Sequence, residues 1–315
     1  MIAPQRPAAV EPPRAGRRVE GLVVAAYRRH YTVELDDRTP IDCVIRGRSL
    51  QLACGDRAAL LRTGSGTGVI ESVGTRGSLF YRSDLFREKL IAANVTQVVG
   101  VVAPDVALDE NLLNRWIVAA AAEGCAFVLA ANKADLPDHS ALLARLKPYA
   151  AFGIEPLSLS AKRDVHPLLA ELAGKRSVLI GQSGMGKSTI INAVAPSAAA
   201  RTAEVSRALK TGRHTTTSTA LYRLPDCDDW IVDSPGMKVF GLAHYPPDAI
   251  VHAFVELRPY EGHCRFTDCR HDREPGCAVQ VAVSDGAIAP QRLALLHDLV
   301  RESEAVRDPR NRSKS

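Results

Sequence analysis

A glycine-rich segment, GQSGMGKST at residues 181–189, most constrains how this chain folds. Gly181, Gly186, Lys187 and Ser188 fit the spacing G-x-x-x-x-G-K-[ST], which forms a phosphate-binding loop when a strand precedes it and a helix follows. The mostly apolar residues SVLI come before the loop, and TIINAVA begins at its end. The sequence therefore predicts a strand, a loop and a helix, and with them an α/β sheet. A chance match in a glycine-rich turn is the alternative.

Each part of this loop has an expected role. Its glycines let backbone N–H groups turn toward phosphates, and the helix start adds positive potential. Lys187 is expected to reach the β- and γ-phosphates of a nucleotide, and Ser188 to bind Mg²⁺. The expected nucleotide-binding residues of the loop are Gly181, Gln182, Ser183, Gly184, Met185, Gly186, Lys187, Ser188 and Thr189.

A second motif, VDSPG at residues 232–236, follows another predicted strand. Asp233 is expected to hold Mg²⁺ through water, and the Gly236 N–H to contact the γ-phosphate. A D-x-x-G tetrapeptide is common by itself, but its place downstream of the phosphate-binding loop gives it weight.

The segment NKAD at residues 132–135 ends a further predicted strand, where open α/β sheets bind ligands. The Asp135 carboxylate can accept hydrogen bonds from guanine N1–H and the 2-amino group, a donor pair that adenine lacks. Asn132 is expected to tie loops together, and the Lys133 stem to lie along the purine face. The Ala161 N–H is expected to donate to guanine O6. The expected base-side residues are Asn132, Lys133, Ala134, Asp135, Ser160, Ala161 and Lys162.

The order of these motifs is reversed, because the base-reading segments precede the phosphate-binding loop. If the two termini of a domain lie close together, they can be joined and the chain opened at another point without changing which residues are neighbours in space. We therefore expect a circularly permuted guanine-nucleotide-binding domain with a mostly parallel sheet. In such a chain the DSPG segment leads directly into the C-terminal region.

A Cys/His cluster lies in that C-terminal region. Cys264, Cys269, His271 and Cys277 offer three thiolates and an imidazole within fourteen residues, a set that suits one structural, tetrahedral Zn²⁺. His263 is the alternative to His271. Cysteines acting as small apolar residues are the other interpretation, although the flanking residues are polar. The remaining cysteines, expected to be structural, are Cys43, Cys54, Cys125 and Cys227.

Short β-type runs separated by turn signals occupy residues 18–77 and predict a small barrel or sandwich, most simply an OB-fold. The segment YRRHY at residues 27–31 interleaves basic and aromatic side chains, as nucleic-acid grooves do. A solvated hairpin tip is the alternative. Residues 1–17 are rich in Pro, Ala and Arg, which predicts a disordered arm.

Composition limits the partners. No apolar run approaches the ~20 residues of a membrane helix, and the N-terminus has no secretory h-region. We therefore expect a cytoplasmic monomer without a membrane partner and without a disulfide framework. The net charge of +5 is compatible with an anionic partner, and the arginine-rich composition fits genome base composition equally well.

The chain resembles a known family, the circularly permuted bacterial GTPase called ribosome small-subunit-dependent GTPase A. The resemblance rests on IAANVTQ, NKAD, GQSGMGKST, GRHTTT, DSPG and YEGHCRFTDCRHDREPGCAV and covers nearly everything from the barrel to the last helix. It implies an OB-fold at 18–77, a permuted GTPase domain at 78–243, a helical zinc domain at 244–306 and a basic tail at 307–315. It also implies a GTP- and GDP-binding factor that assists late maturation of the small ribosomal subunit and contacts its rRNA.

The same resemblance suggests the residues of hydrolysis. Thr216, with Thr215 as second choice, would close on Mg²⁺ and the γ-phosphate, and His214 would act beside Lys187 and Asp233. Met237 stands where many GTPases carry a water-positioning glutamine. We therefore expect slow intrinsic turnover, on the order of 10⁻⁴ to 10⁻² s⁻¹, which the ribosomal subunit stimulates. A solvated loop with an uninvolved histidine is the alternative.

Three other functions are compatible with parts of the pattern. A P-loop ATPase or kinase would use the phosphate side but has no use for the guanine-reading segments. A GTP switch could act on an RNA outside the ribosome. An RNA-binding module with a dead nucleotide site is disfavoured by the presence of Lys187, Ser188 and Asp233.

Overall fold

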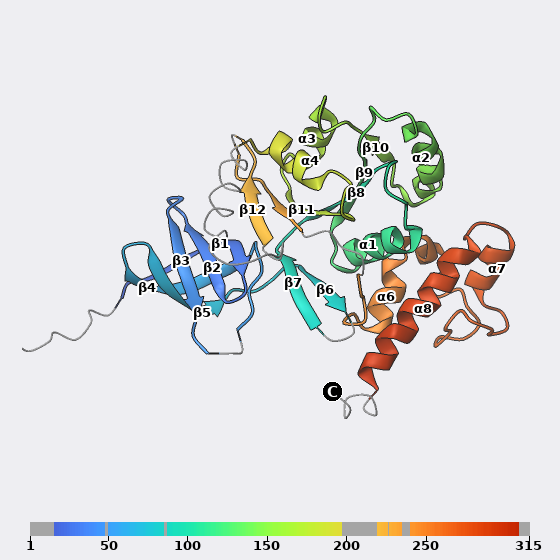
Figure 1. Cartoon of the computed structure of the whole chain (residues 1–315). Helices are drawn as coiled ribbons and strands as arrows, with labels where there is room; N and C mark the ends of the chain where they lie inside the picture. Colours follow the sequence, from blue (N-terminus) through green and yellow to red (C-terminus); the bar gives the residue numbers. More distant parts are fainter. Residues whose placement is uncertain are drawn as a thin grey trace, which may run out of the picture.

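One sheet runs through both the N-terminal barrel and the α/β region in the computed structural model (Figure 1). The structure describes residues 16–47, 50–84, 87–196, 219–225, 227–234 and 240–308, without the side chains of 82–89. Within these residues the strand order is β10-β9-β8-β11-β13-β12-β1-β2-β3-β5-β4. The barrel is therefore not a separate body attached only by a linker.

The N-terminal strands close a small barrel. Strand β1 pairs antiparallel with both β2 and β4, and β3 pairs parallel with β5. Val33, Ile41, Leu60 and Ile70 are fully buried inside it, because the inward positions alternate with polar outward ones. The five-stranded, OB-like barrel predicted from the sequence is confirmed. Its strands are β1 (Arg18–Tyr27), β2 (His30–Leu35), β3 (Pro40–Ile45), β4 (Arg57–Gly64) and β5 (Thr67–Val73).

A two-stranded antiparallel hairpin, β6 (Leu79–Asp84) and β7 (Arg87–Ala93), follows the barrel. It touches the barrel through a bridge between Cys54 and Ala92, and it touches the C-terminal region through the rings of Tyr81 and His244. Strand–helix alternation thus begins only after this hairpin, whereas the GTPase domain is expected to start at residue 78. Strands this short carry only a weak period-two signal, which explains the difference.

The α/β region has a parallel core. Strands β8, β9, β10, β11 and β13 run parallel, and β12 pairs antiparallel with β13. Every residue of β8 is buried, as expected of a strand covered on both faces. These strands are β8 (Gln97–Val102), β9 (Ala126–Ala131), β10 (Pro156–Ser158), β11 (Arg176–Ile180), β12 (Thr219–Arg223) and β13 (Trp230–Asp233).

Helices connect these parallel strands. Helix α1 begins where the Asp109 side chain accepts a hydrogen bond from Leu112 N and ends before Gly124, whose φ of 65° is left-handed. The connecting helices are α1 (Glu110–Ala122), α2 (His139–Leu146), the 3₁₀ helix η1 (Lys147–Phe152), α3 (His166–Leu172) and α4 (Lys187–Val194).

The C-terminal region is helical and packs against α1 through a buried arginine. Arg292 donates to Glu256 at 2.5 Å and to Asn114 of α1 at 2.8 Å, and its guanidinium lies over the rings of Phe152 and Phe254. This cluster joins the C-terminal helices to the α/β region. In Figure 1, α6 and α8 lie beside α1. The elements are α6 (Pro247–Ala253), η2 (Val255–Tyr260), α7 (Ala278–Ser284) and α8 (Pro290–Arg307).

The barrel joins the α/β region along β1 and β12. Ala25 pairs with Ala220, and Ala26 pairs with Thr219. Beside this pairing, the buried Glu34 of β2 accepts two hydrogen bonds from Arg223 of β12, at 3.0 and 2.8 Å. A short ladder and an ion pair therefore hold the barrel to the sheet. None of the described helices is both long enough and apolar enough to cross a membrane.

Candidate functional site

A hollow of about 140 Å³ lies at the carboxyl edge of the parallel sheet, next to the start of α4. Ligands of open α/β sheets bind at this edge. The hollow brings together residues from NKAD, from the SAK segment (residues 160–162) and from the glycine-rich loop. Asn132 and Thr189, two of these residues, are 57 positions apart in the sequence. Its lining residues are Asp105, Asn132, Lys133, Asp135, Leu136, Ser160, Ala161, Lys162, Gly186 and Thr189.

Asn132 ties three loops together. Its Nδ2 donates to the Met185 carbonyl of the glycine-rich loop at 3.0 Å, and its Oδ1 accepts from the Ala161 N–H at 3.0 Å. The side chain is 2% exposed, so these hydrogen bonds form away from water. The Ala161 N–H, which we expect to read guanine O6, thus faces the Asn132 amide in this structure.

Asp135 presents a carboxylate at the open side of the hollow. One of its oxygens accepts a hydrogen bond from the Ser160 hydroxyl at 2.6 Å, and this bond lowers the pKa of Asp135 below its usual value. The residue is exposed, which leaves its other oxygen accessible to donors from the hollow. An ionised carboxylate that is held in one orientation can accept the paired N–H donors of guanine.

Lys133 is held at three points. Its ammonium donates to both Asp105 oxygens, at 2.8 and 2.6 Å, and to the Gly184 carbonyl at 2.6 Å. Its backbone φ of 63° is left-handed, which is uncommon for lysine. Asp105 is absent from the sequence-based site, although its place just after the end of β8 is a signal that could have found it.

Glycines bring the phosphate-binding loop close to the sheet. Gly186 has a φ of 91°, and a Cβ added there would approach Asn132 Nδ2 closer than 3.0 Å. A Cβ on Gly181 would likewise meet the Val101 carbonyl at 2.8 Å. Only glycine therefore fits where the loop passes the NKAD segment and β8.

Lys187 lies inside the glycine-rich loop. Its ammonium donates to the carbonyls of Gly181 and Gln182 at 2.8 and 3.0 Å, and its exposed fraction is 8%. Burial lowers the pKa of Lys187, while the nearby Asp233 carboxylate opposes this shift. Ser188 is the second residue of α4, directly after Lys187, and is exposed. The loop thus offers an ammonium and a hydroxyl at a helix N-terminus, as phosphate sites do.

Asp233 ends β13 beside the glycine-rich loop, since it pairs with Leu179 of β11. Burial raises the pKa of Asp233 to about 6, although Lys187 acts in the other direction. Its Oδ1 is buried and has no hydrogen-bond partner among the described residues. A buried carboxylate oxygen with no partner fits the oxygen ligands that Mg²⁺ prefers.

The remaining predicted residues of the phosphate side, His214, Thr215, Thr216 and Gly236, lie outside the described residues, as does Met237. The expected disordered arm and basic tail also lie mostly outside them. Their predicted roles stay predictions.

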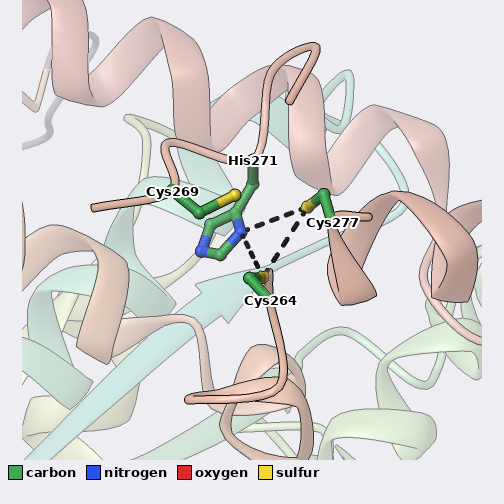
Figure 2. Close-up of side chains that lie close together, drawn as sticks. All are labelled: Cys264, Cys269, His271 and Cys277. Carbon is green, nitrogen blue, oxygen red and sulfur yellow. Dashed lines mark hydrogen bonds between the residues drawn. The ribbon is translucent and has the colours of Figure 1, made fainter. Parts of the chain in front are cut away.

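The Cys/His cluster converges in space, as Figure 2 shows for Cys264, Cys269, His271 and Cys277. All four potential ligand atoms lie within 4.8 Å of one another. The Cys264 and Cys277 sulfurs are 3.9 Å apart, and His271 Nδ1 lies 3.6 Å from the first and 3.4 Å from the second. In a tetrahedral zinc site with Zn–S bonds of about 2.3 Å and Zn–N bonds of about 2.0 Å, two sulfurs lie about 3.8 Å apart and a sulfur and a nitrogen about 3.5 Å apart. The cluster therefore has the dimensions of a tetrahedral zinc site.

Local contacts support this arrangement. The Gln280 side chain donates to the His271 carbonyl at 2.7 Å, and Cys277 caps the start of α7. Burial lowers the pKa of His271, which keeps the imidazole neutral, the form that binds metals. His263 instead contacts the Pro259 carbonyl through Nδ1, at 3.1 Å, and is not part of the cluster. The structure thus selects His271 over His263.

The carboxyl edge of the parallel sheet joins NKAD, SAK and a phosphate-binding loop, and the three occur in this order along the chain. This arrangement defines the class of protein as a circularly permuted P-loop GTPase. Comparison with known proteins agrees. The RsgA GTPase family model matches residues 73–243, and the chain belongs to this family of GTP-hydrolysing enzymes. The part of the chain that it matches contains every nucleotide-binding motif described above.

Two relatives carry the name small ribosomal subunit biogenesis GTPase RsgA. The protein from Nitrosospira multiformis is 44% identical over 100% of this chain and 99% of its own length. The protein from Nitrosomonas europaea is 44% identical over 91% of this chain and 93% of its own length. The likeness therefore extends over the barrel and the Cys/His region as well as the GTPase region.

Two solved structures share the fold. YjeQ from Thermotoga maritima has a TM-score of 0.68 at 28% identity and covers 91% of this chain and 99% of its own. YloQ, described as a circularly permuted GTPase, has a TM-score of 0.65 at 22% identity, over 96% of this chain and 99% of its own. These likenesses support the order of barrel, permuted GTPase region and C-terminal helices.

Proposed function

We propose that this GTPase acts in late maturation of the small ribosomal subunit. The single observation that carries the proposal is the hollow that joins NKAD, SAK and the phosphate-binding loop. The relatives of near-equal length are named for small ribosomal subunit biogenesis. We assign guanine recognition to Asp135, which is held by Ser160, and phosphate binding to Lys187. The region boundaries we propose are 18–77, 78–243 and 244–306.

We infer one Mg²⁺ at the phosphate side and one structural Zn²⁺. Ser188 and Asp233 would hold the first together with Thr216, and Cys264, Cys269, His271 and Cys277 would hold the second. A bound Mg²⁺ neutralises charge on the phosphates. Lys187 then stabilises the charge that develops on the γ-phosphoryl group, and His214 would orient the attacking water.

Two surfaces support contact with rRNA. A hollow of about 490 Å³ beside the β1–β2 turn is lined by Arg28, Arg29 and Tyr31, and none of its described lining residues is acidic. On the Cys/His segment Phe266 is 41% exposed, with the Arg265 guanidinium 5.6 Å from its ring centroid. Basic groups bind phosphates and aromatic faces stack on unpaired bases, so both surfaces suit single-stranded RNA.

The remaining properties follow from the proposal. We expect a cytoplasmic monomer with slow intrinsic turnover, on the order of 10⁻⁴ to 10⁻² s⁻¹, since Met237 cannot orient water. The ribosomal subunit would position His214 and Thr216 for catalysis and accelerate hydrolysis. A P-loop ATPase or kinase is not favoured, because neither the Asp135–Ser160 pair nor the SAK segment would serve adenine.

The test is GTP hydrolysis with and without purified small ribosomal subunits, with ATP in parallel. We expect a stimulation of at least tenfold that is confined to GTP, as partner-supplied activation of other GTPases is larger still. A Lys187→Ala variant controls for contaminating hydrolases, since it lacks the ammonium of the phosphate-binding loop. Equal GTP turnover with and without subunits would refute the ribosomal role, and equal use of ATP would refute the base assignment.

A further inference from the structure

The connection between β8 and α1 places a carboxylate at the base side of the hollow that none of the recognised motifs contains. Asp105 lines the hollow, and both its oxygens accept hydrogen bonds from the Lys133 ammonium, at 2.8 and 2.6 Å. The third donor of the ammonium binds the Gly184 carbonyl at 2.6 Å. An ammonium has three donors, so Asp105 and the glycine-rich loop use all of them.

This anchoring fixes the path of the Lys133 side chain. The backbone starts in a left-handed conformation, and the stem passes Gly186, with Cε 3.7 Å from the position of an added Cβ. The stem therefore crosses the hollow from NKAD toward the phosphate-binding loop. A lysine stem without such an anchor samples many rotamers, and the freedom that it loses on binding weakens affinity.

The ion pair is sheltered enough to matter. The Lys133 side chain is 25% exposed and that of Asp105 is 46% exposed, so water screens the pair only in part. Bidentate acceptance by a carboxylate also fixes the direction of the ammonium, which a single hydrogen bond would not do. A fully exposed pair, in contrast, would contribute little.

We propose that Asp105 is a positioning residue for guanine-nucleotide binding, which holds the Lys133 stem in place for the purine face before the nucleotide arrives. It acts through Lys133 and does not touch the reacting phosphates. The inference rests on the proposed function, because it takes a guanine nucleotide as the ligand of the hollow. It adds to the NKAD and SAK motifs a third determinant of affinity, contributed by the end of another strand.

The test is a double-mutant cycle read out by titration of fluorescent N-methylanthraniloyl-GDP into the nucleotide-free protein. Asp105→Asn is expected to raise Kd about tenfold, the scale of one hydrogen bond to a charged group. In a Lys133→Met background, which keeps an unbranched stem but has no ammonium, the same change is expected to alter Kd less than twofold. Steady-state GTP hydrolysis should show a higher KM and an unchanged kcat.

Three controls separate positioning from a general effect. Glu110→Gln, nearby at the start of α1, removes only a surface ion pair with Arg145, in which both side chains are 53% exposed, and should leave Kd unchanged. Asp105→Glu keeps the carboxylate and should restore most of the affinity. The third control uses a labelled IDP analogue, which lacks the 2-amino group. Asp105→Asn should weaken binding of this analogue by the same factor as binding of the GDP analogue, because the purine face is common to both.

The outcomes are distinct. An unchanged Kd in Asp105→Asn, or an equal loss in the wild-type and Lys133→Met backgrounds, would overturn the positioning role while leaving the proposed function in place. A ratio of IDP to GDP affinity that differs between Asp105→Asn and the wild type would also overturn the positioning role, since it would mean that Asp105 acts on the base edge. If the wild-type protein binds no GDP, or binds ADP as tightly, the proposed function and this inference fail together.

Discussion

At the scale of single residues, Gly186 decides whether the base side and the phosphate side of the site can meet. Its left-handed φ of 91° and the closeness of Asn132 Nδ2 to any added Cβ leave no room for a side chain. The Asn132 amide in turn bonds the Met185 carbonyl of the same loop. The glycine thus lets the NKAD segment hold the loop that carries Lys187.

Gly186→Ala is therefore expected to raise the Kd for GDP at least about 30-fold. The left-handed conformation costs a non-glycine residue about 1–2 kcal/mol, and the displaced Asn132 adds to this. Gly174→Ala is the matched control, because Gly174 has a φ of 71° but nothing within 4 Å of an added Cβ. That control should lower stability by about 1 kcal/mol with an unchanged Kd. Equal changes of Kd in the two variants, measured by nucleotide titration, would contradict the steric argument.

His244 gives a residue-scale prediction of pH dependence. Neither ring nitrogen has a hydrogen-bond partner among the described residues, and the ring lies 4.6 Å from the Tyr81 ring. Burial, with a smaller contribution from Arg307, lowers the pKa of His244 to about 4. The unfolded chain therefore binds a proton at higher pH than the folded chain. Stability is full above about pH 6.5 and falls as the pH drops toward 4, by up to ~3 kcal/mol.

His244→Phe keeps an aromatic ring between Tyr81 and Tyr245 but cannot titrate, so its unfolding free energy should fall less between pH 6.5 and 4.5 than that of the wild type. Denaturant titrations at several pH values measure this slope. His166→Gln is the control, since the His166 side chain is 90% exposed. A pH slope in His244→Phe equal to that of the wild type would show that other groups cause the loss.

The sequence predicted those site residues whose motifs carry their own spacing. Asn132, Asp135 and Ser160 lie together around the hollow because each motif ends a neighbouring parallel strand. Asp105 escaped prediction because its partner, Lys133, belongs to a different strand end, 28 positions away. A pairing of this kind depends on the register of β8 against β9, which no local pattern encodes.

At the scale of elements, the segment between η2 and α7 shows how a region with little core is held. It has neither helix nor strand in the part of the chain that the structure describes, and its Phe266 faces solvent. Only Cys277 of the four clustered residues is buried. A tetrahedral metal site would therefore supply the fixed geometry that apolar packing does not.

Cys269→Ser is accordingly expected to lower the zinc content from about one per chain toward zero and to destabilise the C-terminal helices. Zinc released on denaturation, measured with a chromogenic chelator, gives the stoichiometry. Cys227→Ser, a change at an exposed cysteine outside the cluster, should keep the zinc. The Kd for GDP should stay unchanged in both variants, since the cluster does not line the hollow. Full zinc occupancy in Cys269→Ser would contradict the ligand assignment.

The β6–β7 hairpin marks the limit of prediction at this scale. Its sequence reads as a transition into the α/β region, yet it forms a separate two-stranded sheet. Phe80 and Ala92 are buried, so tertiary contacts stabilise it. Local propensity says little about such a hairpin, because its stability comes from what packs against it.

At the scale of the whole molecule, the barrel and the α/β region share a sheet that the sequence did not predict. Ala26 pairs with Thr219, 193 positions along the chain. The sequence predicted the barrel and the α/β region separately, because alternating patterns identify strands but do not say which strand edges pair across regions. Thr219 also lies three positions after Thr216, one of the two threonines expected to close on Mg²⁺. The β1–β12 pairing thus connects the barrel to the strand that follows them.

The last prediction concerns this junction. Glu34 is 6% exposed and accepts hydrogen bonds from Arg223 and Arg38, so it neutralises two guanidinium groups between β2 and β12. Glu34→Ala removes the buried carboxylate and leaves both guanidinium groups, among the described residues, with only the exposed Asp228 carboxylate as ionic partner. This should destabilise the junction by about 3 kcal/mol, the lower end for a broken buried pair, because both arginines keep Asp228 and some contact with water. Scanning calorimetry should then resolve an earlier transition of the barrel from that of the α/β region.

Glu71→Ala provides the comparison, because Glu71 pairs within the barrel with Arg18, whose side chain is 77% exposed. Such a surface pair contributes at most about 1 kcal/mol, so this variant should unfold much as the wild type does. If Glu34→Ala also unfolds in the same single transition at an unchanged temperature, the ladder between β1 and β12 and the contacts of Cys54 hold the barrel in place without Glu34. The two-residue register of that ladder makes this outcome the less expected one, since so short a pairing buries few hydrogen bonds.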